Sequence, residues 1–322
     1  MRAARFYGAG DVRVEDIPEP TPKEGEVLID VKWGGICGSD LHEYILGPLV
    51  IPTKERPHAL TGDSMPITLG HEFCGRLSKV PTGAKGAGGE ELKEGMPVMV
   101  DPRLHCRACF SCHEGATNVC SKWGFLGLHS ADRGGFAEKV AVQARMCYPL
   151  PESVDLKDAA LIEPLAVGRR ALTVSGVTDW SKLTVLVVGG GPVGLAVLFN
   201  LRAAGMRKVF LSEPTARRQD QCRQLADQVF NPMQMKVPDE CRKLTDEQGV
   251  DVVFDCAGIT PGMHDGMAAL KPKGVYVNVA GWEGPLTLPM GLVMIKEITL
   301  KMTLAYDDKD FGDTVKDYIA GR

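Results

Sequence analysis

The sequence lacks the run of lysine and arginine that a nucleic-acid-binding surface needs. Its 322 residues carry 37 basic and 41 acidic side chains, which gives a net charge of -4. A protein that neutralises backbone phosphates concentrates positive charge on one face, and no stretch of this chain does so. We therefore expect no nucleic-acid partner.

The chain also lacks the features of a secreted or membrane-spanning protein. No apolar core follows residues 1–6, so no secretion signal is expected. Without export, the ten cysteines are expected to be reduced thiols. Residues 183–201 carry no charge, but three glycines and a proline in their middle predict a strand, a tight turn and a helix. We expect no membrane span and a cytoplasmic location.

The pattern of residues changes near residue 155. Before it, glycine and proline recur, and short apolar runs at 27–33, 97–100 and 137–142 predict a β-rich domain. After it, apolar runs alternate with amphipathic segments, which predicts an α/β domain with a doubly wound parallel sheet. The strands are expected at 183–188, 208–212, 250–255, 274–279 and 298–304. The helices are expected at 194–204, 217–226, 240–247 and 263–270.

Four cysteines lie close together in the first part, as C-x2-C-x2-C-x7-C. Four soft thiolates within 15 residues are typical of a closed tetrahedral zinc site. Bacterial ferredoxins share the first two spacings, but their fourth cysteine follows after three residues and precedes a proline. Here seven residues intervene and Ser121 follows. The sequence predicts a structural zinc, with four ordinary buried thiols as the alternative. The expected ligands are Cys106, Cys109, Cys112 and Cys120.

A glycine-rich motif follows the first strand expected after residue 155. Its glycines have the G-x-G-x-x-G spacing, the motif opens an expected helix, and Glu213 ends the next strand. This context predicts a dinucleotide site with the pyrophosphate at the helix N-terminus. The motif residues expected to bind the cofactor are Gly189, Gly191, Pro192, Val193 and Gly194.

Glu213 indicates which dinucleotide binds. A carboxylate accepts hydrogen bonds from the ribose hydroxyls and repels a 2′-phosphate, which favours NAD over NADP. A solvated charge at a strand end is the alternative. Arg217 and Arg218 follow closely and could weaken the exclusion of NADP, and Arg218 is counted among the expected cofactor-binding residues.

A second set of possible metal ligands lies in two motifs. G-G-I-C-G-S-D-L-H at 34–42 contains Cys37, and G-H-E at 70–72 contains His71 and Glu72. Thiolate, imidazole and carboxylate together suit a catalytic zinc with an open fourth position. Each residue alone could equally be a buried core residue.

With these motifs, the chain resembles the zinc-dependent medium-chain alcohol and polyol dehydrogenases over essentially its full length. The resemblance implies a GroES-like catalytic domain over 1–155 and a Rossmann domain over 156–306. It implies one catalytic and one structural zinc, with Cys37 and His71 as catalytic ligands. Glu72 matches a glutamate that ligates zinc in the sorbitol dehydrogenase branch or lies just behind it. Glu163, in I-E-P-L, occupies the position of a second cysteine in classical members, so both glutamates are expected ligands that can exchange.

A glutamate at position 163 indicates the polyol, butanediol and threonine branch. The stretches 40–44, 58–62 and 279–283 are most similar to (R,R)-2,3-butanediol dehydrogenases, and sorbitol or xylitol dehydrogenases are the alternative. The resemblance implies reversible oxidation of a secondary alcohol, such as a vicinal diol or polyol, with hydride transfer to NAD. Ser39 is expected to take the hydroxyl proton and pass it through the ribose hydroxyl to His42 at the surface. Val193 and the turn from Val279 to Gly281 are expected to position the nicotinamide. A homodimer or homotetramer is also implied.

Family members continue for a few dozen residues past the position of Arg322. Residues 307–322 are therefore expected to begin a segment that returns to the catalytic domain and stops early. From this follows an alternative function, that of an inactive zinc- and nucleotide-binding relative.

Overall fold

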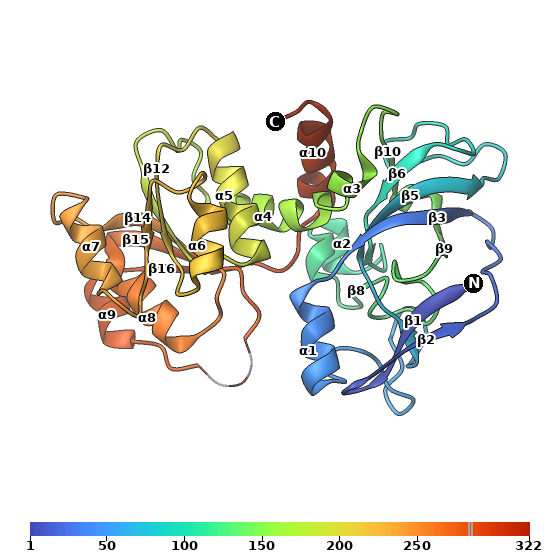
Figure 1. Cartoon of the computed structure of the whole chain (residues 1–322), viewed down its shortest axis with the longest axis horizontal. Helices are drawn as coiled ribbons and strands as arrows, with labels where there is room; N and C mark the ends of the chain where they lie inside the picture. Colours follow the sequence, from blue (N-terminus) through green and yellow to red (C-terminus); the bar gives the residue numbers. More distant parts are fainter. Residues whose placement is uncertain (283, 285) are drawn as a thin grey trace. The chain divides into compact units, whose positions relative to one another are not determined.

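The computed structural model describes residues 1–282, 284 and 286–322. The chain divides into two compact units, which are described separately (Figure 1). Unit 1 comprises Met1–Glu163 and Asp307–Arg322, and unit 2 comprises Pro164–Tyr306.

Unit 1 is built on antiparallel strands. A five-stranded sheet has the order β10-β6-β5-β3-β9, a three-stranded sheet has the order β2-β1-β4, and β7 pairs with β8. The strands are β1 (Arg2–Gly8), β2 (Asp11–Asp16), β3 (Glu26–Gly35), β4 (Ile67–Thr68), β5 (Glu72–Lys79), β6 (Pro97–Val100), β7 (Arg103–Leu104), β8 (Gly124–Phe125), β9 (Lys139–Gln143) and β10 (Cys147–Pro149). The helices are α1 (Gly38–Leu46), α2 (Phe110–His113), α3 (Leu156–Ala159) and α10 (Asp308–Ile319), with 3-10 turns at Thr117–Val119 and Ala144–Met146.

The five-stranded sheet explains where the first metal motif lies. β3 pairs with β9 on one edge and β5 on the other, and its first residues are fully buried in the core of unit 1. Gly35 at the end of β3 lies opposite Glu72 at the start of β5. The chain that leaves β3 therefore begins α1 beside the start of β5, so the two metal motifs meet.

Unit 2 contains a six-stranded parallel sheet. Its order is β13-β12-β11-β14-β15-β16, which is the 3-2-1-4-5-6 order of a dinucleotide-binding Rossmann domain. The strands are β11 (Thr184–Val188), β12 (Lys208–Ser212), β13 (Gln228–Phe230), β14 (Val250–Asp255), β15 (Leu270–Asn278) and β16 (Thr299–Met302). The helices are α4 (Ile162–Ser175), which begins in unit 1, α5 (Pro192–Ala203), α6 (Ala216–Cys222), α7 (Val237–Lys243), α8 (Thr260–Ala269) and α9 (Met290–Ile295).

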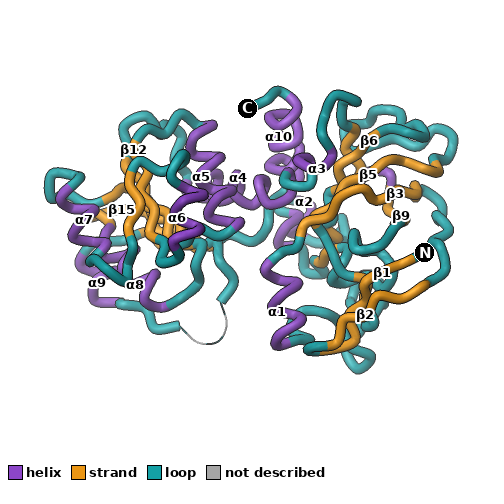
Figure 2. The backbone as a smooth tube through the Cα atoms, in the orientation of Figure 1, coloured by secondary structure: helices purple, strands orange, loops and turns teal. Residues whose placement is uncertain are grey.

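Helices cover both faces of this sheet. Val185 and Val187 of β11 belong to a core with α4 and α5, whereas Leu186 and Val188 belong to a core with α7 and α8. Successive strand side chains point to opposite faces, so a sheet buried on both faces needs continuous apolar strands. Figure 2 shows the sheet between α5 on one side and α7 on the other. The expected α/β class, with a β-rich part and a doubly wound part, is confirmed. None of the helices described is long and apolar enough to cross a membrane.

Candidate zinc and dinucleotide sites

The structure brings three of the expected metal ligands together in unit 1. The Cys37 sulfur, a ring nitrogen of His71 and a carboxylate oxygen of Glu72 all lie within 4.8 Å of one another. Cys37 precedes the first residue of α1, and His71 and Glu72 stand at the entry to β5. A thiolate, an imidazole and a carboxylate at this separation can share one zinc ion and leave a position for substrate.

Burial makes this group costly to ionise without a cation. It raises the pKa of Cys37 to about 11, and the charge of Glu72 adds to the effect. Burial also raises the pKa of Glu72. A divalent cation would reverse the penalty on the two acids, and a thiolate, an imidazole and a carboxylate are donors that zinc accepts, so the residues fit zinc.

Two further polar side chains surround the ligand group. The Ser39 hydroxyl oxygen lies 3.4 Å from Nε2 of His71. Asp40 is 4 % exposed; its Oδ2 accepts a hydrogen bond from the Cys37 N–H at 2.9 Å, and its Oδ1 lies 3.7 Å from Nδ1 of His71. Asp40 was not predicted, although its place three residues after Cys37, in a helix-start pattern, was a usable signal. His42 lies one turn further along α1 and is exposed.

Glu163 is also buried, with 4 % of its surface exposed, near the beginning of α4. Its carboxylate does not belong to the group formed by Cys37, His71 and Glu72. In this structure Glu72 is the glutamate placed to act as the third ligand, and the exchange between the two glutamates stays a prediction.

An uncharged aromatic cluster lies next to the ligand group. The Phe125 ring is 5.7 Å from the His71 ring, and Trp123 is 6.3 Å from Phe125. Burial, reinforced by the neighbouring imidazoles of His58 and His71, lowers the pKa of His129 to about 4. The cluster thus adds apolar surface and a neutral imidazole near pH 7, and the sequence analysis did not single it out.

The four clustered cysteines form the second metal group. Their sulfur atoms all lie within 4.8 Å of one another, and the sulfurs of Cys109 and Cys120 are 3.8 Å apart. A tetrahedral zinc–thiolate site, with Zn–S bonds of about 2.3 Å, separates its sulfurs by roughly 3.8 Å. Backbone N–H groups of Cys106 and Lys122 each donate to the Cys120 sulfur at 3.3 Å. Hydrogen bonds from backbone N–H groups, first that of Ser121, lower the pKa of Cys109 to about 5. The four residues fit a structural zinc.

The glycine-rich turn of unit 2 connects β11 to α5, which begins at Pro192. A Cβ atom on Gly194 would lie 1.9 Å from the Gly189 carbonyl oxygen, so only glycine allows this helix to approach the strand. A Cβ on Gly191 would meet nothing closer than the Arg218 guanidinium at 3.9 Å. The backbone at Gly191 is therefore open to a ligand, as a pyrophosphate at the start of α5 requires.

Glu213 follows β12 beside this turn. It is 2 % exposed, and its carboxylate accepts hydrogen bonds from the N–H groups of Gly190 and Thr215, each at 2.7 Å. It is therefore a fixed, buried carboxylate rather than a solvated charge. The Arg218 guanidinium lies near Gly191 and is exposed, so it could reach an anionic ligand. Val279 and Gly281 lie in the loop after β15, whereas Glu283 lies outside the described residues.

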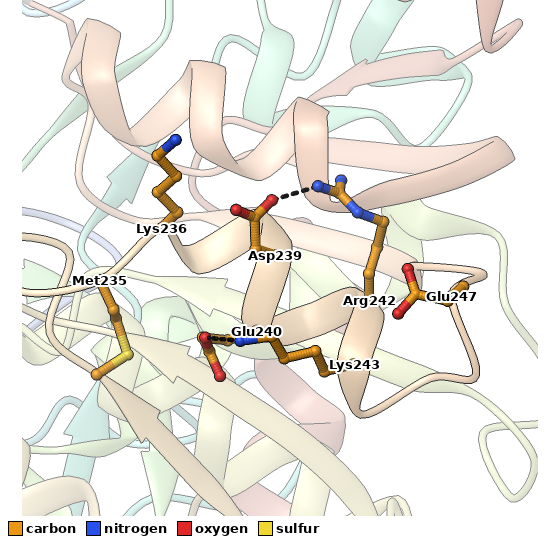
Figure 3. A pocket seen from close by; sticks show the side chains of 7 residues that line it. All are labelled: Met235, Lys236, Asp239, Glu240, Arg242, Lys243 and Glu247. Carbon is orange, nitrogen blue, oxygen red and sulfur yellow. Dashed lines mark hydrogen bonds and ion pairs between the residues drawn. The ribbon is translucent and has the colours of Figure 1, made fainter.

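The cavity shown in Figure 3 involves none of the residues of these groups. It has a volume of about 410 Å³ and is lined by residues of α7 and its flanks. Four of its six charged side chains pair within the helix, Arg242 with Asp239 and Lys243 with Glu240. It contains none of the expected site residues, and a self-paired, solvated helix face accounts for it.

The chain is similar to known dehydrogenases throughout. Residues 23–152 match the alcohol dehydrogenase GroES-like domain family, and residues 192–319 match the zinc-binding dehydrogenase family. An (R,R)-butanediol dehydrogenase of Neisseria gonorrhoeae is 40% identical over 319 residues, covering 98% of this chain and 87% of the relative. A D-xylulose reductase A of Aspergillus oryzae is 31% identical over 324 residues, covering 98% and 85%. The crystal structure of a 2R,3R-butanediol dehydrogenase from Bacillus subtilis superposes with a TM-score of 0.89 at 35% identity, covering 99% and 88% of the two chains.

Proposed function

The chain belongs to the zinc-containing alcohol dehydrogenase family, and from this we propose that 2,3-butanediol or a closely related vicinal diol is its substrate. It is a zinc-dependent oxidoreductase that transfers hydride between a secondary alcohol and NAD. The similarity to butanediol dehydrogenases supports the choice of diol. The observation that best supports zinc-dependent chemistry is that Cys37, His71 and Glu72 lie together in one largely buried group.

Each residue of this group has a proposed role. Cys37, His71 and Glu72 hold the catalytic zinc, and Glu163 is a ligand that can replace Glu72. Asp40 fixes the Cys37 backbone and faces the outer nitrogen of His71, which orients the imidazole.

When bound, zinc acidifies the alcohol hydroxyl and NAD accepts the hydride. Ser39, whose oxygen lies beside His71, would accept the hydroxyl proton while it passes its own proton through the ribose hydroxyl to exposed His42, which releases a proton to solvent.

The cofactor roles follow from unit 2. Gly189, Gly191, Pro192, Val193 and Gly194 form the pyrophosphate turn. The Glu213 carboxylate accepts hydrogen bonds from the hydroxyls of the adenosine ribose. The Arg218 side chain lies within reach of the pyrophosphate. Val279 and Gly281 belong to the loop on which the nicotinamide rests. The separate cysteine group holds the structural zinc.

A panel of NAD-linked oxidations tests the proposal. We expect kcat/KM for 2,3-butanediol to exceed that for ethanol at least about tenfold, because a site that pairs with a second hydroxyl rejects alcohols lacking it. His71→Ala or removal of zinc by a chelator should abolish the activity. His113→Ala, a histidine exposed on α2 outside both ligand groups, is the matched control and should stay active. Ethanol outperforming every diol would overturn the assignment.

A polyol is the second candidate substrate. The similarity to a D-xylulose reductase favours it, because reduction of a ketose produces a polyol. Xylitol and sorbitol belong in the same panel, and a higher kcat/KM for either than for 2,3-butanediol would establish this alternative.

We also propose that the enzyme is a homo-oligomer, with α9 and β16 at the interface between copies. Among the described strands, β16 pairs only with β15, so its other edge is open. Met294 and Ile295 of α9 and Met302 of β16 are 73%, 80% and 59% exposed. A second copy placed by a two-fold axis could cover both the apolar side chains and the strand edge.

A further inference from the structure

A buried carboxylate and a buried phenol meet behind the nucleotide-binding edge of unit 2. Asp255, the last residue of β14, is fully buried, and Tyr276 of β15 is 1 % exposed. The Tyr276 hydroxyl donates a hydrogen bond to Oδ2 of Asp255. Burial and the charge of Asp255 both raise the pKa of Tyr276, so the phenol stays protonated and remains a donor.

The other carboxylate oxygen holds the loop that follows β14. Oδ1 of Asp255 accepts hydrogen bonds from the N–H groups of Ala257 at 2.9 Å and Gly258 at 3.1 Å. The carboxylate is thus held from both sides. Tyr276 anchors one oxygen in the sheet, and the second oxygen fixes the turn.

The main chain of the same residue holds the loop that follows β15. The Asp255 carbonyl oxygen accepts hydrogen bonds from the N–H groups of Val279 at 2.9 Å and Ala280 at 3.0 Å. Asn278 closes this loop from within, because its amide donates to the Ala280 carbonyl at 2.8 Å and accepts from the Trp282 indole at 2.7 Å. One residue at the end of one strand therefore positions two loops.

These loops also pack tightly against each other and against the glycine-rich turn. Gly258 has a φ of +63°, and a Cβ there would lie 2.4 Å from the Gly281 carbonyl oxygen. A Cβ on Gly189 would lie 3.1 Å from the Cβ of Ala257. A shift of the Asp255 turn would therefore displace backbone on both of its neighbours.

Topology indicates which part of the cofactor these loops meet. The pyrophosphate binds after β11, at the centre of the sheet, and Glu213 after β12 draws the adenosine to one side. The nicotinamide half must then extend over the strands on the other side, β14 and β15. We propose that Asp255 and Tyr276 are positioning residues for the nicotinamide half of NAD, acting through the loops 256–258 and 279–282; the inference rests on the proposed use of NAD.

ADP-ribose separates the two halves of the cofactor experimentally, because it lacks only the nicotinamide. We would measure binding of NADH and of ADP-ribose to wild type, Tyr276→Phe and Asp255→Asn by calorimetry, and thermal unfolding of each protein. The two substitutions keep the size of the side chain while removing the phenol donor or the charge. Tyr148→Phe, at a partly buried tyrosine whose ring centroid lies 5.0 Å from that of Phe311 in unit 1, is the control.

We expect the NADH dissociation constant to rise about fivefold to tenfold in both variants, a range set by a weakened hydrogen bond to a charged group. ADP-ribose affinity should stay within about twofold of wild type, and Tyr148→Phe should bind both ligands normally. Equal weakening of both ligands, or no change in either, would refute the positioning role. Failure of the wild-type protein to bind NADH would instead refute the proposed cofactor.

Discussion

At the scale of single residues, two buried carboxylates at the ends of the two strands that flank β11 hold different loops. The Glu213 carboxylate, after β12, accepts hydrogen bonds from one N–H group of the glycine-rich turn and one of its own turn. Asp255 ends β14, on the other side of β11. Its carboxylate accepts hydrogen bonds from N–H groups of its own turn and from the Tyr276 hydroxyl of β15. We propose that the first carboxylate selects the adenosine ribose and that the second supports the nicotinamide loops. In this proposal each carboxylate acts on one half of a dinucleotide that crosses the centre of the sheet.

Glu213 is expected to set the choice between NAD and NADP. Glu213→Ser should lower the ratio of kcat/KM for NAD to that for NADP about tenfold or more, because the variant loses the ribose acceptor and the repulsion of a 2′-phosphate. Steady-state kinetics with both cofactors measure the ratio. Asp220→Ser removes a charge that is exposed on α6 and is the control. A wild-type enzyme that prefers NADP would contradict this role for Glu213.

Residues in spaced motifs could be predicted from the sequence, and residues paired across the fold could not. Both ligand groups could be proposed from the sequence, one from the cysteine spacing and the other from Cys37 and the G-H-E motif. In the structure the members of each group lie close to one another. Asp255 and Tyr276 are 21 positions apart and meet only because β14 and β15 are adjacent. No local pattern encodes that pairing.

At the scale of elements, the parallel strands were the most predictable part of the fold. The expected strands at 208–212 and 250–255 coincide with β12 and β14, because strands buried on both faces read as continuous apolar runs. The helix α1 was missed in the β-rich half. Many of its apolar side chains, such as Leu41 and Ile45, are exposed. The helix therefore lacks the buried apolar face with helical spacing by which a helix is found in a sequence.

The position of α10 in unit 1 depends on contacts distant in sequence. The Arg103 guanidinium donates to Asp101 at 2.6 Å and to Asp308, the first residue of α10, at 2.7 Å. Thr117, between the third and fourth clustered cysteines, also donates to Asp308, at 2.8 Å. The cysteine lobe therefore shares a polar network with α10.

The two zinc sites are expected to behave differently when they lose their metal. Wild type should contain two zinc ions per chain, and Cys109→Ser and Cys37→Ser should each contain one. Cys109→Ser should also lower Tm by at least about 5 °C, because a structural zinc contributes folding free energy to the lobe and to its contact with α10. Cys37→Ser should lose activity with a smaller change in Tm.

Elemental analysis and thermal unfolding of the same samples separate these effects. His113→Ala alters a lobe residue that is no ligand, and it should retain both zinc ions. One zinc in the wild type, unchanged by Cys37→Ser, would exclude zinc at the catalytic group.

At the scale of the whole molecule, assembly is expected to depend on unit 2 rather than unit 1. An open strand edge beside exposed apolar side chains favours association, and a two-fold axis covers the same surface on both partners. Ile295→Glu would place a charge within that surface and should reduce the assembly to smaller species. Val14→Glu changes an equally apolar side chain, 74% exposed on β2 of unit 1, and should leave the assembly intact. Light scattering with size-exclusion chromatography would report masses in multiples of the 34.8 kDa chain. A monomeric wild type, or an Ile295→Glu variant of unchanged mass, would show that this surface does not join copies of the chain.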